Sequence, residues 1–204
     1  MHVAISGNIG AGKTTLTNLL AKHYKWDTHF EDVENNPYLN DFYEDMQRWS
    51  FNLQIFYLNS RFTQIQEIKN SEKTVIQDRT IYEDAFIFAP NLHKMGLMST
   101  KDFENYFSLF SLMEKFISAP DLLIHLRASV PTLVNQISQR GREYEESIRI
   151  DYLKRLNERY EAWISTYSKG KVIIVDVDNN NFKENPEDLG KIINDIDAEI
   201  NGLF

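Results

Sequence analysis

The sequence predicts an α/β fold with a mainly parallel sheet of about five strands and helices on both faces. Five apolar segments of strand length occur along the chain, and helical periodicity fills the gaps between them. Strands that alternate with helices are typical of a parallel sheet covered on both sides. The chain has 204 residues and no linker-like segment or internal repeat, so we expect a single domain over residues 1–204.

The elements follow one another in a regular order. The expected strands are residues 2–6, 28–33, 74–78, 121–126 and 171–177. The expected helices are residues 14–24, 40–69, 99–119, 130–140, 148–168 and 186–201. Ser99 or Thr100 has the side chain that caps the third helix, and Pro120 ends it. Gly170 is expected to close the helix over 148–168, and the Asn-rich residues 178–185 are expected to form a loop.

The composition excludes several classes of protein. There are 22 Lys and Arg against 30 Asp and Glu, a net charge of −8, whereas proteins that bind nucleic-acid backbones usually carry a basic excess. We therefore expect no nucleic-acid partner, although a local basic pocket is compatible with this charge. The absence of cysteine excludes thiolate metal sites and a cysteine nucleophile. No leader pattern and no run of roughly 20 apolar residues occurs, so we expect a cytoplasmic protein without membrane contact.

Residues 7–14 read GNIGAGKT and match the phosphate-loop pattern G-x-x-x-x-G-K-[ST]. The glycines let the backbone curl so that its N–H groups point at phosphate oxygens, and the following helix directs its positive end to the same anion. Lys13 is expected at the outer phosphates, and the Thr14 hydroxyl is expected to bind Mg²⁺. The residues expected at ATP phosphates are Gly7, Asn8, Ile9, Gly10, Ala11, Gly12, Lys13, Thr14 and Thr15.

The other motifs in the chain indicate which class of protein uses the triphosphate. The N-K-x-D and D-x-x-G motifs of GTP-binding switches do not occur, and a motor protein would need a longer chain. Small-molecule kinases therefore remain. The second expected strand ends in Glu31-Asp32-Val33, where Glu31 should face the same crevice as the loop and accept a proton from an attacking hydroxyl. The third expected strand ends at Asp78-Arg79, where Asp78 suits a magnesium-side carboxylate and Arg79 a cation for the transferred phosphoryl group.

Five motifs, taken in their order along the chain, resemble those of a known family. They are GNIGAGKTT at 7–15, EDV at 31–33, W-x-x-x-x-Q from Trp49 to Gln54, DRT at 78–80 with Asp84 behind it, and RGREYEE at 140–146. Together they resemble the deoxynucleoside kinases of the deoxycytidine, deoxyguanosine and deoxyadenosine kinase type. The resemblance runs from Met1 to about residue 183. It implies a P-loop kinase fold with an Arg-rich lid at about 138–148.

The resemblance assigns residues to the sugar. Glu31 matches the glutamate that contacts the sugar 5′-hydroxyl and serves as the base. Tyr43 and Glu145 match the pair that holds the 3′-hydroxyl. Relatives often have two consecutive acids in the lid, where this chain has Tyr144 and Glu145. If a gap is allowed, Glu146 becomes the sugar ligand instead.

The resemblance also assigns residues to recognition of the nucleobase. Gln54 matches a glutamine that makes two hydrogen bonds to the base, and Arg61 with Asp84 matches a base-reading pair. An amide and an ionised carboxylate favour a base with an amino group. Arg61 is expected to crowd the 5-methyl group of thymine. We therefore expect deoxyadenosine as the best substrate, deoxyguanosine and deoxycytidine as poorer ones, and thymidine as unused; the preference for adenine comes from the resemblance.

On the ATP side, Asp78 and Arg79 match an acidic-Arg-Ser motif in which relatives often have Glu and Ser. The shorter acid here would bind magnesium through water. Arg140 and Arg142 match the lid arginines that close on the phosphates. Asn180, Asn181 and Phe182 match the loop that borders the adenine of ATP.

Two rival functions stay open, as does the oligomeric state. A deoxynucleoside-monophosphate kinase of the thymidylate type shares the phosphate loop, a DR motif and an Arg lid. A non-catalytic ATP-binding regulatory module would share only the loop. Relatives are dimers, and the helix over 99–119 carries more apolar surface than one buried stripe needs, although a wide core stripe explains that surface nearly as well.

Overall fold

The computed structural model describes residues 1–33, 35–145 and 148–202, and within them five parallel strands form one sheet in the order β2-β3-β1-β4-β5. The strands are β1 (His2–Gly7), β2 (Asp27–His29), β3 (Val75–Asp78), β4 (Leu122–Arg127) and β5 (Lys171–Asp176). Strand β1 lies at the centre, where Ile5 pairs with Asp78 of β3 and with Ile124 of β4. The expected fold class is confirmed.

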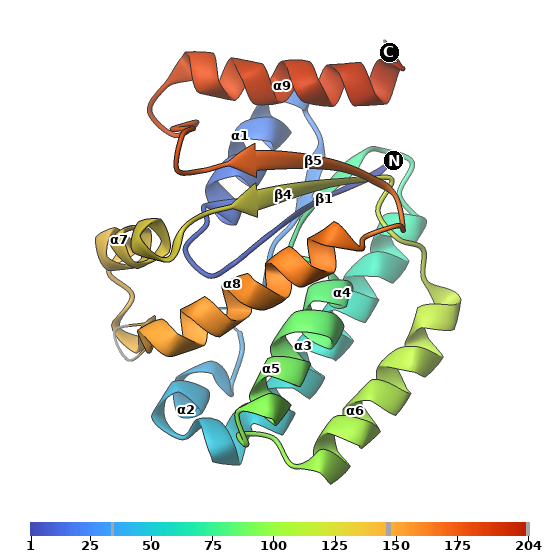
Figure 1. Ribbon diagram of the computed structural model, residues 1–204. Coiled ribbons are helices and arrows are strands. Elements are labelled where there is room, and N and C mark those ends of the chain that lie inside the picture. Colours follow the sequence, from blue (N-terminus) through green and yellow to red (C-terminus); the bar gives the residue numbers. More distant parts are fainter. Residues whose placement is uncertain (34, 146–147, 203–204) are drawn as a thin grey trace.

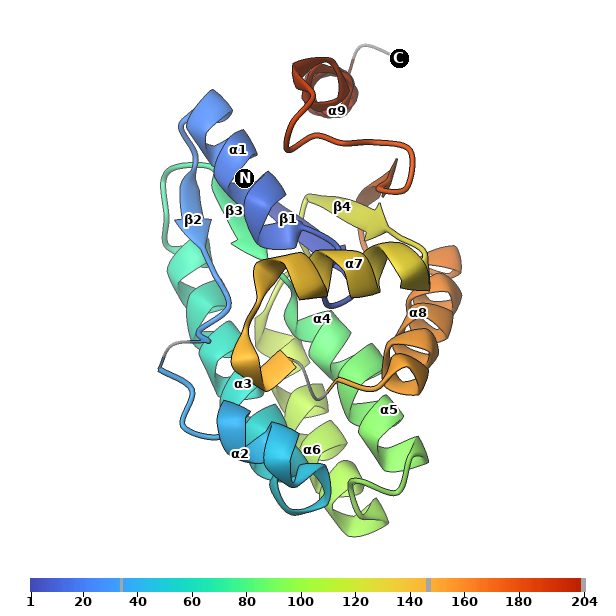
Figure 2. The same cartoon turned by 90° about the vertical axis from the view of Figure 1, so that its left-hand side faces the viewer.

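Helices cover both faces of the sheet (Figure 1). The pair α1 (Lys13–Tyr24) and α9 (Pro186–Asn201) lies on one face. The opposite face carries α3 (Met46–Lys69), α4 (Ile81–Glu83), α5 (Ala89–Lys94), α6 (Thr100–Met113) and α8 (Ile150–Ser165). The arrowheads of β4 and β5 point toward α7 (Val130–Arg140), and α2 (Leu39–Glu44) lies below α7 (Figures 1 and 2).

Each layer has its own apolar core. Leu16 of α1 and Ile196 of α9 pack with β-strand residues such as Ile5 and Ile124, and all four are fully buried. On the other face, Leu58 of α3 and Leu156 of α8 belong to a second cluster that reaches α6. Burial on both faces explains why the middle of β1, residues 3–5, and the start of β4, residues 122–124, are consecutive apolar residues rather than alternating ones.

Several expected boundaries were wrong. The second strand ends at His29, so Glu31 lies two residues beyond it. The segment 40–69 is two helices, because the Asp45 side chain accepts a hydrogen bond from the Arg48 N–H and begins α3 anew. Ser99 caps α6 as expected, but α6 ends at Met113 and a 3₁₀ turn, Glu114–Phe116, follows it. Gly170 does not close α8, which ends at Ser165.

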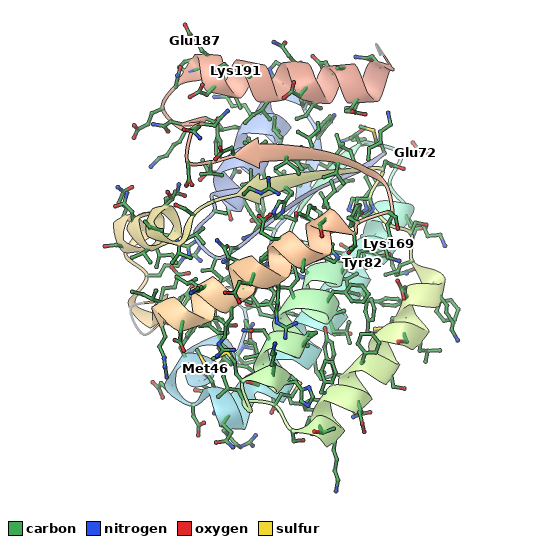
Figure 3. All side chains as sticks on the ribbon, in the orientation of Figure 1. Met46, Glu72, Tyr82, Lys169, Glu187 and Lys191 are labelled. Carbon is green, nitrogen blue, oxygen red and sulfur yellow. The ribbon has the colours of Figure 1, made fainter. Side chains whose placement is uncertain are left out.

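The segment after β3 was not anticipated as helical. It runs from α4 through a π-helical turn, Asp84–Phe88, into α5. Single π-helical turns are rare and frequently occur at functional sites. At its outer side, the ammonium of Lys169 lies 5.0 Å from the ring centre of Tyr82, a cation–π contact that ties the chain after α8 to α4 (Figure 3).

Within the described ranges, no helix is both long and apolar enough to span a bilayer.

Candidate active site

A cavity of about 1900 Å³ opens at the carboxyl ends of the strands. Parallel strands place their carboxyl ends at one edge of the sheet, which is where ligands bind in open α/β folds. The predicted site residues that line the cavity are Ile9, Gly10, Gly12, Lys13, Thr14, Thr15, Glu31, Tyr43, Gln54, Asp78, Arg79, Asp84, Arg140, Arg142, Glu145, Asn180, Asn181 and Phe182. The predicted residues Gly7, Asn8, Ala11 and Arg61 are buried behind this lining.

The phosphate loop joins β1 to α1 and depends on its glycines. Gly7 and Gly10 have φ values of 147° and 83°, and a Cβ at either position would lie 2.8 Å from a backbone oxygen, that of Leu126 or Leu133 respectively. Asn8 anchors the loop to α8, because its side-chain N–H group donates to the Leu153 carbonyl at 3.0 Å. The loop is therefore fixed from both sides.

Lys13 curls back over the loop, and its Nζ donates to the Asn8 carbonyl at 3.0 Å. Burial, assisted by the positive charge of Arg79, lowers the pKa of Lys13 to about 8. The loop thus holds a cation whose charge is poorly compensated by the protein. An anionic phosphate would supply that compensation.

Thr14 and Asp78 meet across the junction of α1 and β3. The Thr14 hydroxyl donates to Asp78 Oδ2 at 2.5 Å, and Asp78 Oδ1 is buried without a hydrogen-bond partner among the described residues. A hydroxyl beside a carboxylate with a free oxygen is a donor set that suits Mg²⁺, which prefers oxygen ligands and keeps several waters. The two residues expected to bind metal therefore fit that ion.

Glu31 lies between two guanidinium groups. Its Oε1 accepts a hydrogen bond from Arg61 at 3.0 Å and lies 3.5 Å from Nε of Arg79. Burial alone would raise the pKa of the Glu31 carboxyl, but Arg79 and Arg61 outweigh it and hold that pKa below its ordinary value. Glu31 is therefore ionised at neutral pH.

Arg61 also holds Asp84, at 2.5 Å from its Nε to Oδ2. Its NH1 group donates to the backbone carbonyls of Asp78 and Arg79, and its side chain is only 1% exposed. Burial raises the pKa of Asp84 to about 6, while Arg61 opposes that rise. Arg61 thus fixes two cavity carboxylates from behind the wall.

Gln54 and Tyr43 contribute the polar and aromatic parts of the inner cavity. Gln54 on α3 is 2% exposed, and its Oε1 has no hydrogen-bond partner among the described residues. The ring of Tyr43 stacks on Tyr144 with 5.6 Å between ring centres. The cavity therefore offers a buried amide oxygen that a ligand donor would satisfy.

The two arginines expected in the lid, Arg140 and Arg142, lie beside Glu145. Arg140 donates to both carboxylate oxygens of Glu145, at 2.9 and 2.5 Å, and Arg142 lies 3.5 Å from one of them. The alternative sugar ligand, Glu146, lies outside the described residues. The structure brings the two predicted lid arginines and one predicted sugar ligand, Glu145, together as one charged cluster.

The loop after β5 closes the remaining side. A Cβ at Gly12 would lie 3.1 Å from the Phe182 ring, so that ring borders the phosphate loop directly. The Asn181 N–H donates to Asp188 Oδ2 at 3.0 Å, which fixes the loop to α9. Asn180 Oδ1 is buried without a partner among the described residues.

Sequence reasoning missed the residues that support this site. Glu83 and Tyr160 are buried beside the phosphate loop, and Phe88 and Tyr152 line the cavity. Thr80-x-x-Glu83 has the spacing of a capping box, and that pattern was available in the sequence. The contribution of Tyr160 depends on tertiary packing that no local pattern encodes.

The fold and the loop define a P-loop kinase. The deoxynucleoside kinase family model matches residues 3–201, so the chain belongs to the deoxynucleoside kinase family, whose members are phosphotransferases. It is 37% identical to the deoxyadenosine/deoxycytidine kinase of Bacillus subtilis over 97% of this chain and 92% of that protein. It is 40% identical to the deoxyadenosine kinase of Dictyostelium discoideum over 94% and 77% of the two chains.

Solved structures agree with this assignment. The structure of deoxyadenosine kinase from M. mycoides with dCMP and dCDP has a TM-score of 0.87 at 29% identity, over 97% of this chain and 100% of that chain. The same kinase with bound dATP has a TM-score of 0.86. The family resemblance that the motifs indicated is confirmed.

Proposed function

We propose that this deoxynucleoside kinase uses Mg-ATP to phosphorylate the 5′-hydroxyl of deoxyadenosine, with deoxyguanosine and deoxycytidine as poorer substrates. The observation that carries the proposal is the Glu31 carboxylate, ionised between Arg61 and Arg79 in the cavity that the phosphate loop also lines. A carboxylate there can accept a hydroxyl proton, and it would repel an acceptor that already carries a phosphate. That repulsion disfavours a monophosphate kinase.

In the reaction, the 5′-oxygen attacks the γ-phosphorus while its proton passes to Glu31. The new O–P bond forms as the bond from the γ-phosphorus to the β,γ-bridging oxygen breaks, which releases ADP. Lys13 and Arg79 neutralise charge on the phosphates from inside the cavity, and Arg140 and Arg142 do so from the lid at about 138–148. Catalysis is then mostly positioning and charge stabilisation.

Thr14 and Asp78 would hold Mg²⁺, which supplies charge neutralisation at the phosphates when bound. On the donor side, we assign Asn180, Asn181 and Phe182 to the adenine of ATP. Their support is that they line the same cavity and that Phe182 borders Gly12.

For the base of the acceptor, we assign Gln54 together with the pair Arg61 and Asp84. The side chains of Gln54 and Asp84 line the cavity, and both favour an exocyclic amino group. Arg61 acts through Asp84, because its own side chain is buried behind that carboxylate. Tyr43 and Glu145 are assigned to the sugar 3′-hydroxyl.

Adenine is favoured because two of the similar proteins are named deoxyadenosine kinases. The Bacillus subtilis and Dictyostelium discoideum proteins are deoxyadenosine kinases, the former also a deoxycytidine kinase, at 37% and 40% identity. Deoxyguanosine kinases of Lactobacillus johnsonii and Bacillus subtilis follow at 34%. A cytoplasmic location belongs to this proposal because ATP is the donor.

A homodimer is also part of the proposal. Leu112 and Phe116 are 53% and 61% exposed, and a groove between α3 and α6 is lined by apolar residues including Phe51, Ile55 and Leu109. A second copy of the chain would bury this surface. Sedimentation of the protein beside Leu112→Glu tests it: a dimer that the substitution dissociates supports the proposal, and a monomeric parent protein contradicts it.

Incubation with ATP and either deoxyadenosine or its monophosphate tests the function. We expect dAMP from deoxyadenosine and no diphosphate from the monophosphate. Diphosphate formation would indicate a monophosphate kinase. ATP binding without turnover across a panel of nucleosides would indicate a regulatory module.

A further inference from the structure

Glu83 is the last residue of α4, and its carboxylate is completely buried without lining the cavity. Every group bonded to it is a donor from the candidate active site or its supports. Burying a carboxylate is costly unless its oxygens are fully hydrogen-bonded, so this arrangement needs a reason.

One oxygen of Glu83 holds the start of the phosphate loop. Its Oε1 accepts a hydrogen bond from the Gly7 N–H at 3.2 Å and another from the Tyr160 hydroxyl at 2.9 Å. Gly7 is 76 residues away in the sequence, and Tyr160 is 77 residues away. This oxygen therefore joins β1 and α8 to the end of α4.

The other oxygen holds the turn that follows β3. Its Oε2 accepts hydrogen bonds from the Thr80 N–H at 2.7 Å and from the Thr80 hydroxyl at 3.1 Å. The preceding residue, Arg79, has φ of 72°, a left-handed conformation that non-glycine residues rarely adopt. Such a conformation persists only where its surroundings fix it, and the capped Thr80 is part of that surrounding.

Tyr160 carries the connection on to the Arg79 side chain. The Arg79 NH1 group donates to the Tyr160 hydroxyl at 3.3 Å, and that hydroxyl in turn donates to Glu83. The ring of His125 stacks on Tyr160 with 5.6 Å between centres, and Tyr160 is 2% exposed. The hydroxyl is thus held in a single place between a cation and a carboxylate.

We propose that Glu83 is a positioning residue that fixes the phosphate loop and Arg79 relative to each other. It acts on Arg79 through Tyr160. The inference rests on the proposed roles of the loop and Arg79 in phosphoryl transfer. A carboxylate is required because Gly7, Thr80 and Tyr160 all present donors. A glutamine would turn an N–H group toward one of these donors and leave it unpaired.

Two variants distinguish the hydrogen bond of Glu83 to the phosphate loop from its connection to Arg79 through Tyr160. Tyr160→Phe removes the connection to Arg79 and leaves the hydrogen bond from Gly7 to Glu83. We expect kcat to fall about tenfold, while ATP affinity, measured by calorimetry, stays within about twofold of the parent. Glu83→Gln disturbs both the hydrogen bond to Gly7 and the connection to Arg79, so we expect kcat to fall about a hundredfold and ATP to bind about tenfold more weakly. Tyr24→Phe is the matched control, because it also removes a hydrogen bond from a tyrosine hydroxyl to a carboxylate, that of Asp197 at 2.8 Å, between α1 and α9 and outside the cavity lining.

A purely structural role predicts a different outcome. Glu83→Gln and Tyr160→Phe would then lower the melting temperature while kcat and ATP affinity of the folded protein match the parent. That result, or an equal loss of kcat in Tyr24→Phe, overturns the proposal. If Glu83→Gln does not fold, the kcat-only effect of Tyr160→Phe still decides it. Calorimetric ATP binding needs no acceptor, so an error in the proposed function appears as absent turnover in the parent protein instead.

Discussion

Arg61 donates a hydrogen bond to Glu31 at 3.0 Å from behind the cavity wall. The same guanidinium holds Asp84, so the carboxylate proposed as proton acceptor and the one proposed to read the base share a single cation. A change at Arg61 should therefore alter both turnover and base selection. This coupling is the basis of the first two predictions.

Arg61→Met should shift the acid limb of the pH profile of kcat to higher pH. In the parent protein, Arg79 and Arg61 outweigh burial and keep the pKa of Glu31 below its ordinary value, so the loss of kcat through protonation of Glu31 should begin at lower pH than for an ordinary glutamate. Without Arg61, burial is less opposed and the pKa of Glu31 rises. Measurements of kcat from pH 5 to 8 check this, and an unchanged limb would show that Arg61 does not tune Glu31.

Arg61→Met combined with Asp84→Ala should raise thymidine activity relative to deoxyadenosine. Loss of the buried acceptor Asp84 removes a preference for an amino group, a difference of roughly ten- to a hundredfold in kcat/KM. Competition between the two nucleosides measures the ratio directly. Efficient use of thymidine by the unaltered protein would contradict this account of base selection.

ATP affinity should fall as pH rises above about 8. The pKa of free Lys13 is lowered to about 8, chiefly by burial, so the side chain is charged below that pH and loses its charge above it. Bound phosphates favour the charged form, so binding near pH 8 should take up a proton. Calorimetry in buffers of different ionisation enthalpy measures that uptake. Deoxyadenosine, which is uncharged, is the control ligand and should show neither effect.

Arg140→Ala and Arg142→Ala should each lower kcat by about ten- to a hundredfold with a smaller change in the KM for deoxyadenosine. The two guanidinium groups line the cavity, and both lie beside Glu145. Arg149→Ala is the matched control, because Arg149 is exposed and pairs with Asp151 outside the cavity. Weaker nucleoside binding at an unchanged kcat would remove these arginines from phosphoryl transfer.

Local patterns in the sequence were enough to predict the sheet and the phosphate loop. The loop motif is contiguous, and β1, β3 and β4 each contain a run of consecutive apolar residues, so neither prediction needed tertiary information. The helix over 81–94 was missed because residues 85–90 read AFIFAP, an apolar run without clear periodicity and with a proline.

The supporting contacts could not be predicted for a different reason. Arg61 has the expected partner Asp84, yet its second bond, to Glu31, crosses 30 residues and depends on how α3 packs. Glu83 depends on Gly7 and Tyr160, which are still further away in the chain. Periodicity shows which side chains are buried, but it does not show which buried polar groups meet.

The rate of the chemical step in Glu31→Gln tests the central claim most directly. Glutamine keeps the shape of the side chain but cannot accept the 5′-hydroxyl proton as a carboxylate does. In single-turnover measurements with ATP and deoxyadenosine, we expect a loss of about 10²- to 10⁴-fold, the usual contribution of a general base. Binding of both substrates and the far-UV circular dichroism spectrum should be retained. A near-normal rate with a normal spectrum would contradict the assignment of Glu31 as the proton acceptor.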